Sequence, residues 1–204
     1  MLILKWVICA LFFCIAALPG VLYAQSPTGE TGRKNSYAVL KMGSFIPDSG
    51  DLDQLNAKNG FTGQIGFGYY LYPNFALEAA VGYSEFRADT QIANTDRKFK
   101  VYPLEVAGKL GIPIGFLEPY FELGLGAYYV KSTAGNLEET STRPGAFVGG
   151  GINFNLSKSV FLGAEARYSV LSASAPVATP HSGSATVDVN LYGVIVTGNL
   201  GFRF

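Results

Sequence analysis

Hydrophobic and polar residues alternate along most of the chain after residue 34. In residues 61–71, for example, Phe61, Ile65 and Phe67 share one set of alternate positions and Gln64 belongs to the other. A period of two residues is typical of a β-strand with one apolar face. The same alternation predicts strands at about 35–47, 61–71, 75–83, 99–112, 119–131, 146–156, 160–171 and 188–204.

The connections between these predicted strands are alternately long and short. Short connections fall at 73–74, 113–118 and 157–159, and long polar ones fall at 48–60, 88–98, 132–145 and 172–187. An even number of antiparallel strands with short turns at one end and long loops at the other is the pattern of transmembrane β-barrels. The sequence therefore predicts an all-β fold, an eight-stranded antiparallel up-and-down transmembrane β-barrel over residues 35–204.

A soluble eight-stranded barrel such as a lipocalin has the same alternation and is the competing architecture. Such a barrel would turn its aromatic face inward and would need a well-charged outer face. Here the non-aromatic positions are mostly Gly, Ala, Ser and Asn, with one or two charges per strand. Small residues suit the filling of a narrow lumen. We therefore expect the aromatic face to meet lipid and the non-aromatic face to line the lumen.

The first 24 residues are predicted to be a secretory signal peptide. Lys5 precedes an apolar stretch that ends at Leu18, and Ala24 provides a small residue at the cleavage position. Cleavage after Ala24 leaves 180 of the 204 residues. Residues 25–34 form a polar leader without periodicity, which we expect to lie in the periplasm.

Composition narrows the range of functions. Charged residues make up 15% of the chain, aromatic residues make up 14%, and the formal net charge is zero. The aromatic content argues against intrinsic disorder, and the lack of a basic excess argues against nucleic-acid binding. Both cysteines, Cys9 and Cys14, lie in the predicted signal peptide, so we expect no disulfide in the mature chain.

Charged residues on the non-aromatic face are expected to form a structural cluster in the lumen. If the hairpins are symmetric, Lys109 stands opposite Glu78 on one side and opposite Glu122 on the other. The Cβ atoms of such partners lie about 5 Å apart, and a buried cation between two anions is partly compensated. The predicted cluster comprises Glu78, Lys109, Glu122, Glu105, Glu165, Arg167 and Arg203, with Lys41 as a further counter-charge.

Candidate catalytic and metal-binding residues are few. His181 is the only histidine, and Gly183 two residues later leaves no His-x-Ser pair, so we interpret His181 as an exposed loop residue. One histidine without a mature cysteine cannot build a His/Cys metal site. Asp48, Asp51 and Asp53 lack the spacing of a calcium loop. We expect no catalytic residue, no metal, no cofactor and no enzymatic activity.

Several segments resemble the OmpA-like transmembrane domain. They are Ala107-Gly-Lys-Leu-Gly-Ile-Pro-Ile114, Pro119-Tyr-Phe-Glu-Leu-Gly-Leu-Gly126, Phe154-Asn-Leu-Ser-Lys-Ser-Val-Phe-Leu-Gly-Ala-Glu-Ala-Arg-Tyr168 and Gly198-Asn-Leu-Gly-Phe-Arg-Phe204. The peptidoglycan-binding domain that follows the barrel in OmpA is not found after them. The resemblance is therefore closer to the stand-alone small outer-membrane β-barrels of the OmpX and Ail kind.

The resemblance implies a monomeric barrel in the outer membrane of a Gram-negative cell, with both termini in the periplasm. The family's luminal salt-bridge network carries over only in part. Glu78, Lys109 and Glu165 match its acidic, basic and acidic positions. Asn153 and Gly163 stand where that network has an acidic residue and an arginine, so the switchable charge gate proposed for OmpA does not transfer directly.

Three functions are compatible with these features. The leading hypothesis is a structural or surface-interaction barrel of the adhesion type, with a plugged lumen. The alternative is a narrow channel for small or hydrophobic solutes, as in OmpW, and the third is a lipid-modifying enzyme. The expected partners are outer-membrane lipid and lipopolysaccharide, the barrel-assembly machinery, which would read Phe204, and a surface ligand bound by the four long loops.

Overall fold

The structure is a computed structural model that describes residues 35–48, 58–90, 95–134, 137–178 and 184–204. Side chains within 88–97, 134–137 and 172–191 are not described. The predicted signal peptide, the predicted leader, both cysteines and His181 lie outside the described residues.

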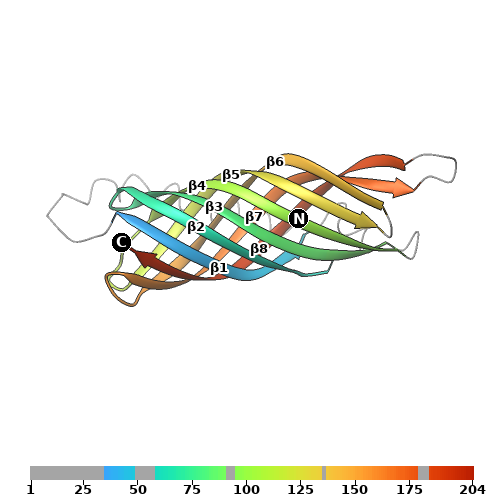
Figure 1. Cartoon of the computed structure of the whole chain (residues 1–204). Coiled ribbons are helices and arrows are strands. Elements are labelled where there is room, and N and C mark those ends of the chain that lie inside the picture. Colours follow the sequence, from blue (N-terminus) through green and yellow to red (C-terminus); the bar gives the residue numbers. More distant parts are fainter. Residues whose placement is uncertain (1–34, 49–57, 91–94, 135–136, 179–183) are drawn as a thin grey trace. The chain divides into compact units, whose positions relative to one another are not determined.

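Eight antiparallel strands form a single closed barrel in which each strand pairs with its sequence neighbours (Figure 1). The strands are β1 (Ser36–Pro47), β2 (Gly60–Tyr72), β3 (Phe75–Thr90), β4 (Thr95–Gly111), β5 (Leu117–Ala134), β6 (Leu137–Asn155), β7 (Val160–Ala178) and β8 (Ser184–Arg203). The predicted all-β, eight-stranded up-and-down barrel is confirmed. Within the described ranges, no helix has the length and apolar character needed to cross a membrane.

Pairing of β1 with β8 closes the barrel and runs from Tyr37↔Arg203 to Pro47↔Gly193. Beyond the last pair, the Ser36 amide donates to the Phe204 carbonyl (3.3 Å) and the Phe204 amide donates to the Ser36 carbonyl (2.9 Å). Because closure leaves no unpaired strand edge in this region, the backbone polar groups are satisfied without water.

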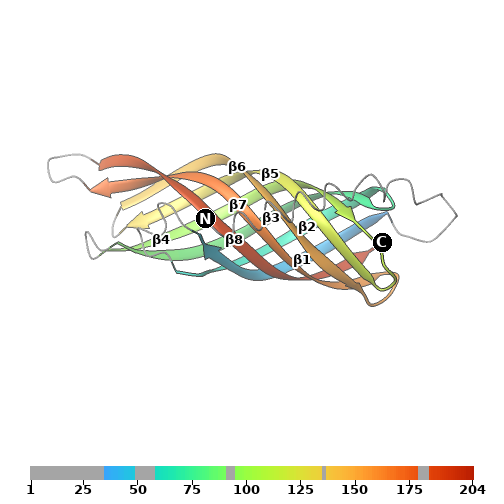
Figure 2. The ribbon, with the colours of Figure 1, turned by 180° about the vertical axis from the view of Figure 1, so that it is seen from behind.

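The two ends of the barrel differ. We call the end that carries the connections 73–74, 112–116 and 156–159 the turn end; Ser36 and Phe204 also lie there. We call the opposite end the loop end. Figures 1 and 2 show the β3–β4, β5–β6 and β7–β8 hairpins extending toward it.

Strands β3 to β8 run farther toward the loop end than the sequence predicts. The predicted loops 88–98, 132–145 and 172–187 are therefore wrong in extent, because strands cover all of their described residues. The outer face carries a band of exposed apolar side chains, which we call the apolar belt. The alternation of apolar and polar residues ends where the strands extend beyond this belt. Backbone pairing continues because Thr, Ser and Lys residues can form strands whose faces are both polar.

The apolar positions of the alternating pattern face outward, as predicted. Ile65, Leu125 and Leu156 are 64%, 68% and 63% exposed. Buried charged residues, by contrast, are confined to the inner face. This arrangement is the reverse of a water-soluble barrel and matches a barrel surrounded by lipid, so the lipocalin-like alternative does not fit.

The expectation of a lumen without aromatic residues is wrong. Eight aromatic side chains are buried there: Tyr37, Phe45, Phe86, Phe99, Tyr120, Tyr128, Phe147 and Phe161. Glycines on neighbouring strands provide the space, since a Cβ at Gly68 would overlap the Tyr37 ring and a Cβ at Gly201 would overlap the Phe161 ring. The parity of a position along its strand, and not its aromatic character, decides which face it occupies.

Substituting Leu125 with Arg should destabilise the barrel by about 2–4 kcal/mol, because Leu125 is exposed in the apolar belt. Thr142 is the control. We predicted it in a loop, but it lies on β6 opposite Tyr129, at the edge of the belt. Arg there should cost at most about 1 kcal/mol. Unfolding by denaturant in lipid bilayers measures both variants, and equal costs would contradict a membrane-facing outer surface.

Candidate functional site

The centre of the lumen holds five charged side chains, Lys41, Glu78, Lys109, Glu122 and Glu165, which we call the central cluster. Lys41 on β1 reaches across the lumen, with its Nζ 2.9 Å from Glu78 Oε1 on β3 and 2.9 Å from Glu165 Oε2 on β7. All three side chains are almost completely buried. Lys41 therefore connects strands that are not neighbours in the sheet.

Lys109 occupies the middle of the same cluster. Its Nζ lies 2.9 Å from Glu78 Oε2, 3.3 Å from Glu122 Oε2 and 3.3 Å from Glu165 Oε2. The ammonium also lies 4.7 Å from the centre of the Tyr120 ring. One lysine thus contacts all three carboxylates of the central cluster.

The predicted pairing of Lys109 with Glu122 is confirmed, since the two residues are direct partners across β4 and β5. The predicted pairing of Lys109 with Glu78 is wrong by two residues: Lys109 faces Ala76, and Glu78 faces Ala107. The β3–β4 connection is centred between residues 92 and 93, one residue earlier than the assumed loop centre. Lys109 still reaches Glu78, because side chains two residues apart share a face and a long side chain spans the diagonal.

Tyrosine hydroxyls complete the coordination of two of the three carboxylates. Tyr37 donates to Glu78 Oε2 (2.8 Å), and Tyr120 donates to Glu165 Oε2 (2.7 Å). Glu78 and Glu165 therefore each accept contacts from both lysines and one tyrosine. Neither Glu122 oxygen has a hydrogen-bond donor among the described residues, and its one ion pair is the longer contact with Lys109.

A separate ion pair lies one layer closer to the loop end than the central cluster. Arg167 on β7 binds Glu105 on β4 with both of its terminal nitrogens, at 2.8 and 3.4 Å. Tyr128 and Gln64 also donate to Glu105, at 2.8 and 3.2 Å. The guanidinium carbon of Arg167 lies 4.6 Å from the centre of the Phe147 ring. Such a two-nitrogen pair has a well-defined geometry.

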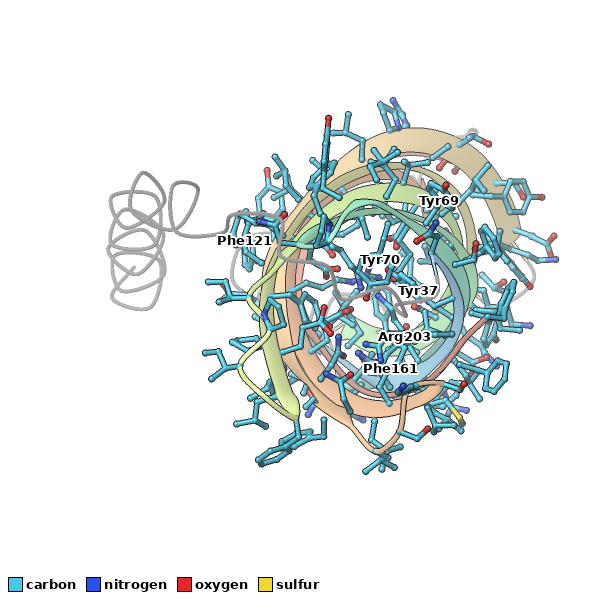
Figure 3. The ribbon with its side chains drawn as sticks, turned by 90° about the vertical axis from the view of Figure 1, so that its left-hand side faces the viewer. Tyr37, Tyr69, Tyr70, Phe121, Phe161 and Arg203 are labelled. Atoms are coloured by element: carbon cyan, nitrogen blue, oxygen red, sulfur yellow. The ribbon has the colours of Figure 1, made fainter. Side chains whose placement is uncertain are left out.

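Another luminal ion pair lies at the turn end, where Arg203 Nη2 is 3.0 Å from Glu118 Oε2. The Arg203 guanidinium also covers the Phe161 ring at 4.5 Å, and Phe161 packs edge-on against Tyr37. Viewed from this end, Tyr37, Tyr70, Phe161 and Arg203 lie inside the ring of strands, whereas Phe121 lies outside it (Figure 3).

Apolar side chains fill the lumen toward the loop end. The rings of Phe86 and Phe99 stack with their centres 5.0 Å apart, and Phe45 packs against Phe86 at the same distance. We call the whole group the loop-end apolar cluster; its members are Phe45, Phe86, Phe99, Val101, Tyr128, Val130, Leu171 and Ile195.

A small cavity lies between the central cluster and the turn end, bordered by Tyr37, Glu78, Lys109, Glu118 and Phe161 among others. Its volume is about 20 Å³. A water molecule needs at least about 10–15 Å³ measured in this way, so the cavity has room for about one water.

The predicted luminal residues Glu78, Lys109, Glu122, Glu105, Glu165, Arg167 and Arg203 all lie on the inner face. The structure adds Lys41 as a central member and Glu118 and the luminal tyrosines as new ones. Glu118 lies on the same face of β5 as Glu122 and could be found from that spacing, but the sequence pattern predicts a turn at 113–118. No group of three or more His, Cys, Asp or Glu residues in the described part of the chain could hold a metal ion.

Solved structures share this fold. Neisserial surface protein A is 16% identical with a TM-score of 0.57, and the match covers 84% of this chain and 100% of that one. OprG from Pseudomonas aeruginosa is 16% identical with a TM-score of 0.64, over 85% and 98% of the two chains. Ail, the attachment invasion locus protein of Yersinia pestis, is 18% identical with a TM-score of 0.51, over 84% and 98%.

No curated protein matches the chain. A protein family does match: the profile of the outer membrane protein beta-barrel domain extends over residues 8–204, which is nearly the whole sequence. With its closed eight-stranded barrel, apolar outer face and charged lumen, the chain belongs to the outer membrane protein beta-barrel domain family.

Proposed function

We propose that this protein is an outer-membrane barrel with a plugged lumen and a structural or surface-interaction role of the adhesion type. The observation that supports the proposal is the close packing of the described side chains inside the barrel, from the turn end to the loop-end apolar cluster. Arg203 and the rings around it lie at the turn end, two layers of ion pairs lie in the middle, and the loop-end apolar cluster lies beyond them. The cavity between the central cluster and the turn end, at about 20 Å³, is too small for a solute larger than water.

The proposed placement has the turn end in the periplasm and the loop end outside the cell. In outer-membrane barrels the short turns lie on the periplasmic side. The barrel would then carry Ser36 and Phe204 on the periplasmic side and direct the loop-end termini of its strands to the exterior. Loops carry variable binding functions on a rigid scaffold, which supports a surface-interaction role.

The lumen assignment is tested by Lys109→Ala with planar-bilayer conductance. Wild-type protein should conduct little, because ion pairs and aromatic rings occupy the lumen. Removing Lys109 leaves Glu122 without its ion pair and leaves Glu78 and Glu165 with Lys41 alone, so stability should fall and conductance should rise. The exposed turn residue Lys158 is the control, and its Ala variant should match wild type. Steady conductance of the wild type would overturn the plugged lumen and favour a narrow channel.

Three Glu→Gln variants test whether the central cluster is structural. Glu78→Gln and Glu165→Gln each remove a charge that two lysines share, and each should cost about 3 kcal/mol or more. Glu122→Gln should change the unfolding free energy by less than about 1 kcal/mol, because loss of its one 3.3 Å ion pair is offset by relief of repulsion from Glu165. Denaturant unfolding in bilayers measures the series. Equal losses of unfolding free energy at all three positions would contradict the weaker coordination of Glu122 relative to Glu78 and Glu165.

Deleting Phe204 should lower outer-membrane insertion and leave secretion intact. The Phe204 side chain is 52% exposed on the outer face, where it packs beside Phe67 and Phe202. Its loss should therefore affect recognition by the assembly machinery more than packing of the barrel. Membrane yield and heat-modifiable mobility in cells are compared with refolding of the same variant into detergent. Unchanged membrane yield of the variant, or an equally large loss of refolding in detergent, would contradict the proposed assembly role of Phe204.

A further inference from the structure

One carboxylate in the lumen has no strong partner. Glu122 on β5 is completely buried, and neither of its oxygens accepts a hydrogen bond from a described residue. Among the described residues its one ion pair joins Glu122 Oε2 to Lys109 Nζ at 3.3 Å. An ionised carboxylate has acceptor atoms and no donor. If Glu122 were ionised, its burial would therefore leave both oxygens without a hydrogen-bond donor, which is costly.

The other described charges in the lumen balance one another. They form ion pairs of opposite sign: Arg167 with Glu105, Arg203 with Glu118, and Lys41 and Lys109 with Glu78 and Glu165. Glu139 and Arg143 have opposite charges and lie on β6 at the level of the loop-end apolar cluster or beyond it. Strand residues whose side chains are not described all belong to the loop-end parts of their strands. Glu122 is therefore the surplus negative charge between the turn end and the loop-end apolar cluster.

The two neighbouring strands offer Glu122 no better partner. β6 places Gly149 directly opposite it, and β4 places Lys109 there. Lys109 Nζ lies closer to Glu78 Oε2, at 2.9 Å, than to Glu122 Oε2, at 3.3 Å. The cavity with room for one water borders Lys109 but not Glu122. Lys109 is thus a shared cation, and its shortest contact is with another carboxylate.

Across the lumen, Glu122 faces charges that already have closer partners. Lys41 and Arg167 attract a Glu122 carboxylate, and Glu165 repels it. Lys41 Nζ lies 2.9 Å from Glu165 Oε2, and Arg167 binds a different carboxylate with two of its nitrogens. Glu122 and Glu165 each place Oε2 3.3 Å from Lys109 Nζ, so two carboxyl groups share one ammonium. Two carboxyl groups at a shared site do not both ionise readily.

We propose that Glu122 is a proton-binding site: the barrel takes up one proton from the surrounding water as it folds and holds it there, so Glu122 is an uncharged carboxylic acid at neutral pH. The proton belongs on Glu122 and not on Glu165, because Glu165 accepts hydrogen bonds from Lys41 and Tyr120. Protonation removes the surplus charge and gives the carboxyl group a donor. The site is independent of a surface-interaction role, since it concerns the interior of the barrel alone.

The bound proton makes the stability of the barrel depend on pH in a defined direction. An unfolded glutamate ordinarily loses its proton at about pH 4.3. Between that pH and the pH at which Glu122 loses its proton in the barrel, the folded state holds one more proton than the unfolded state. Raising the pH within this interval therefore favours unfolding, by a factor of about ten per pH unit. The stabilisation is complete below the interval and absent above it.

Infrared spectroscopy tests the proton directly, with Glu122→Gln as the variant because Gln resembles the uncharged acid in shape and hydrogen-bonding atoms. In phosphatidylcholine bilayers at neutral pH, wild type should show the C=O stretching band of a carboxylic acid, and Glu122→Gln should lack it. Glu138→Gln is the control and should keep the band, because Glu138 is an exposed partner of Lys131. A wild-type spectrum without the band, or a band that Glu122→Gln retains, would overturn the proton site.

Denaturant unfolding of the same proteins over a pH series measures the proton taken up on folding. The unfolding equilibrium constant of wild type, relative to that of Glu122→Gln, should rise up to tenfold per pH unit within the interval. Comparison with the Gln variant removes the contributions of the other carboxylates, which both proteins share. A constant ratio of the two equilibrium constants across the series would overturn the proposal.

A change of salt separates a proton from a bound metal ion. Replacing sodium with a bulky organic cation at constant ionic strength and pH should leave the stabilities of wild type and Glu122→Gln unchanged relative to each other. A loss of stability confined to wild type would show that Glu122 is an ionised ligand of sodium, and would overturn the assignment to a proton.

Discussion

The interior of an eight-stranded barrel is just wide enough to be filled by side chains, and this constraint governs the rest of the structure. The inward positions must supply both volume and balanced charge. Glycines on several strands make room for rings from their neighbours, as Gly68 does for Tyr37. Carboxylates and lysines occupy the centre because long side chains can meet there from opposite walls, as Lys41 and Glu165 do at 2.9 Å.

Because these central ion pairs are buried, the stability gained by forming one is much smaller than the stability lost by removing one of its partners. A buried ion pair adds little net stability over apolar packing, but removing one partner leaves an unpaired charge that is costly. Lys41 links β1 to β3 and β7, and Arg167 links β7 to β4. A strand that slipped by one residue would turn its charged side chains toward lipid. The luminal ion pairs therefore specify the register of the barrel more than they add to its stability.

Much of this fold could be predicted from the sequence, because alternation with a period of two decides which face each residue occupies. It gave the eight strands, the outward position of Leu125 and the direct pairing of Lys109 with Glu122, whose turn is short. Alternation does not indicate where hairpins with two polar faces end, so the predicted strands are too short at the loop end. That error also moved the centre of the β3–β4 connection and shifted the partner of Glu78.

The aromatic residues of the lumen could not be predicted from their type. Phe99 and Tyr128 are as suitable for lipid as Tyr102 and Tyr129, and only their parity along β4 and β5 places the first two inside. The same parity places Lys100 and Lys131 outside, among tyrosines, where no luminal carboxylate can reach them. Charge inside the barrel is held by partners within the chain. Charged side chains described on the outer face of these strands lie beyond the apolar belt, where Lys131 pairs with Glu138. The two faces of β4 and β5 therefore have separate roles: the inner residues hold the register of the strands, and the outer ones face the membrane.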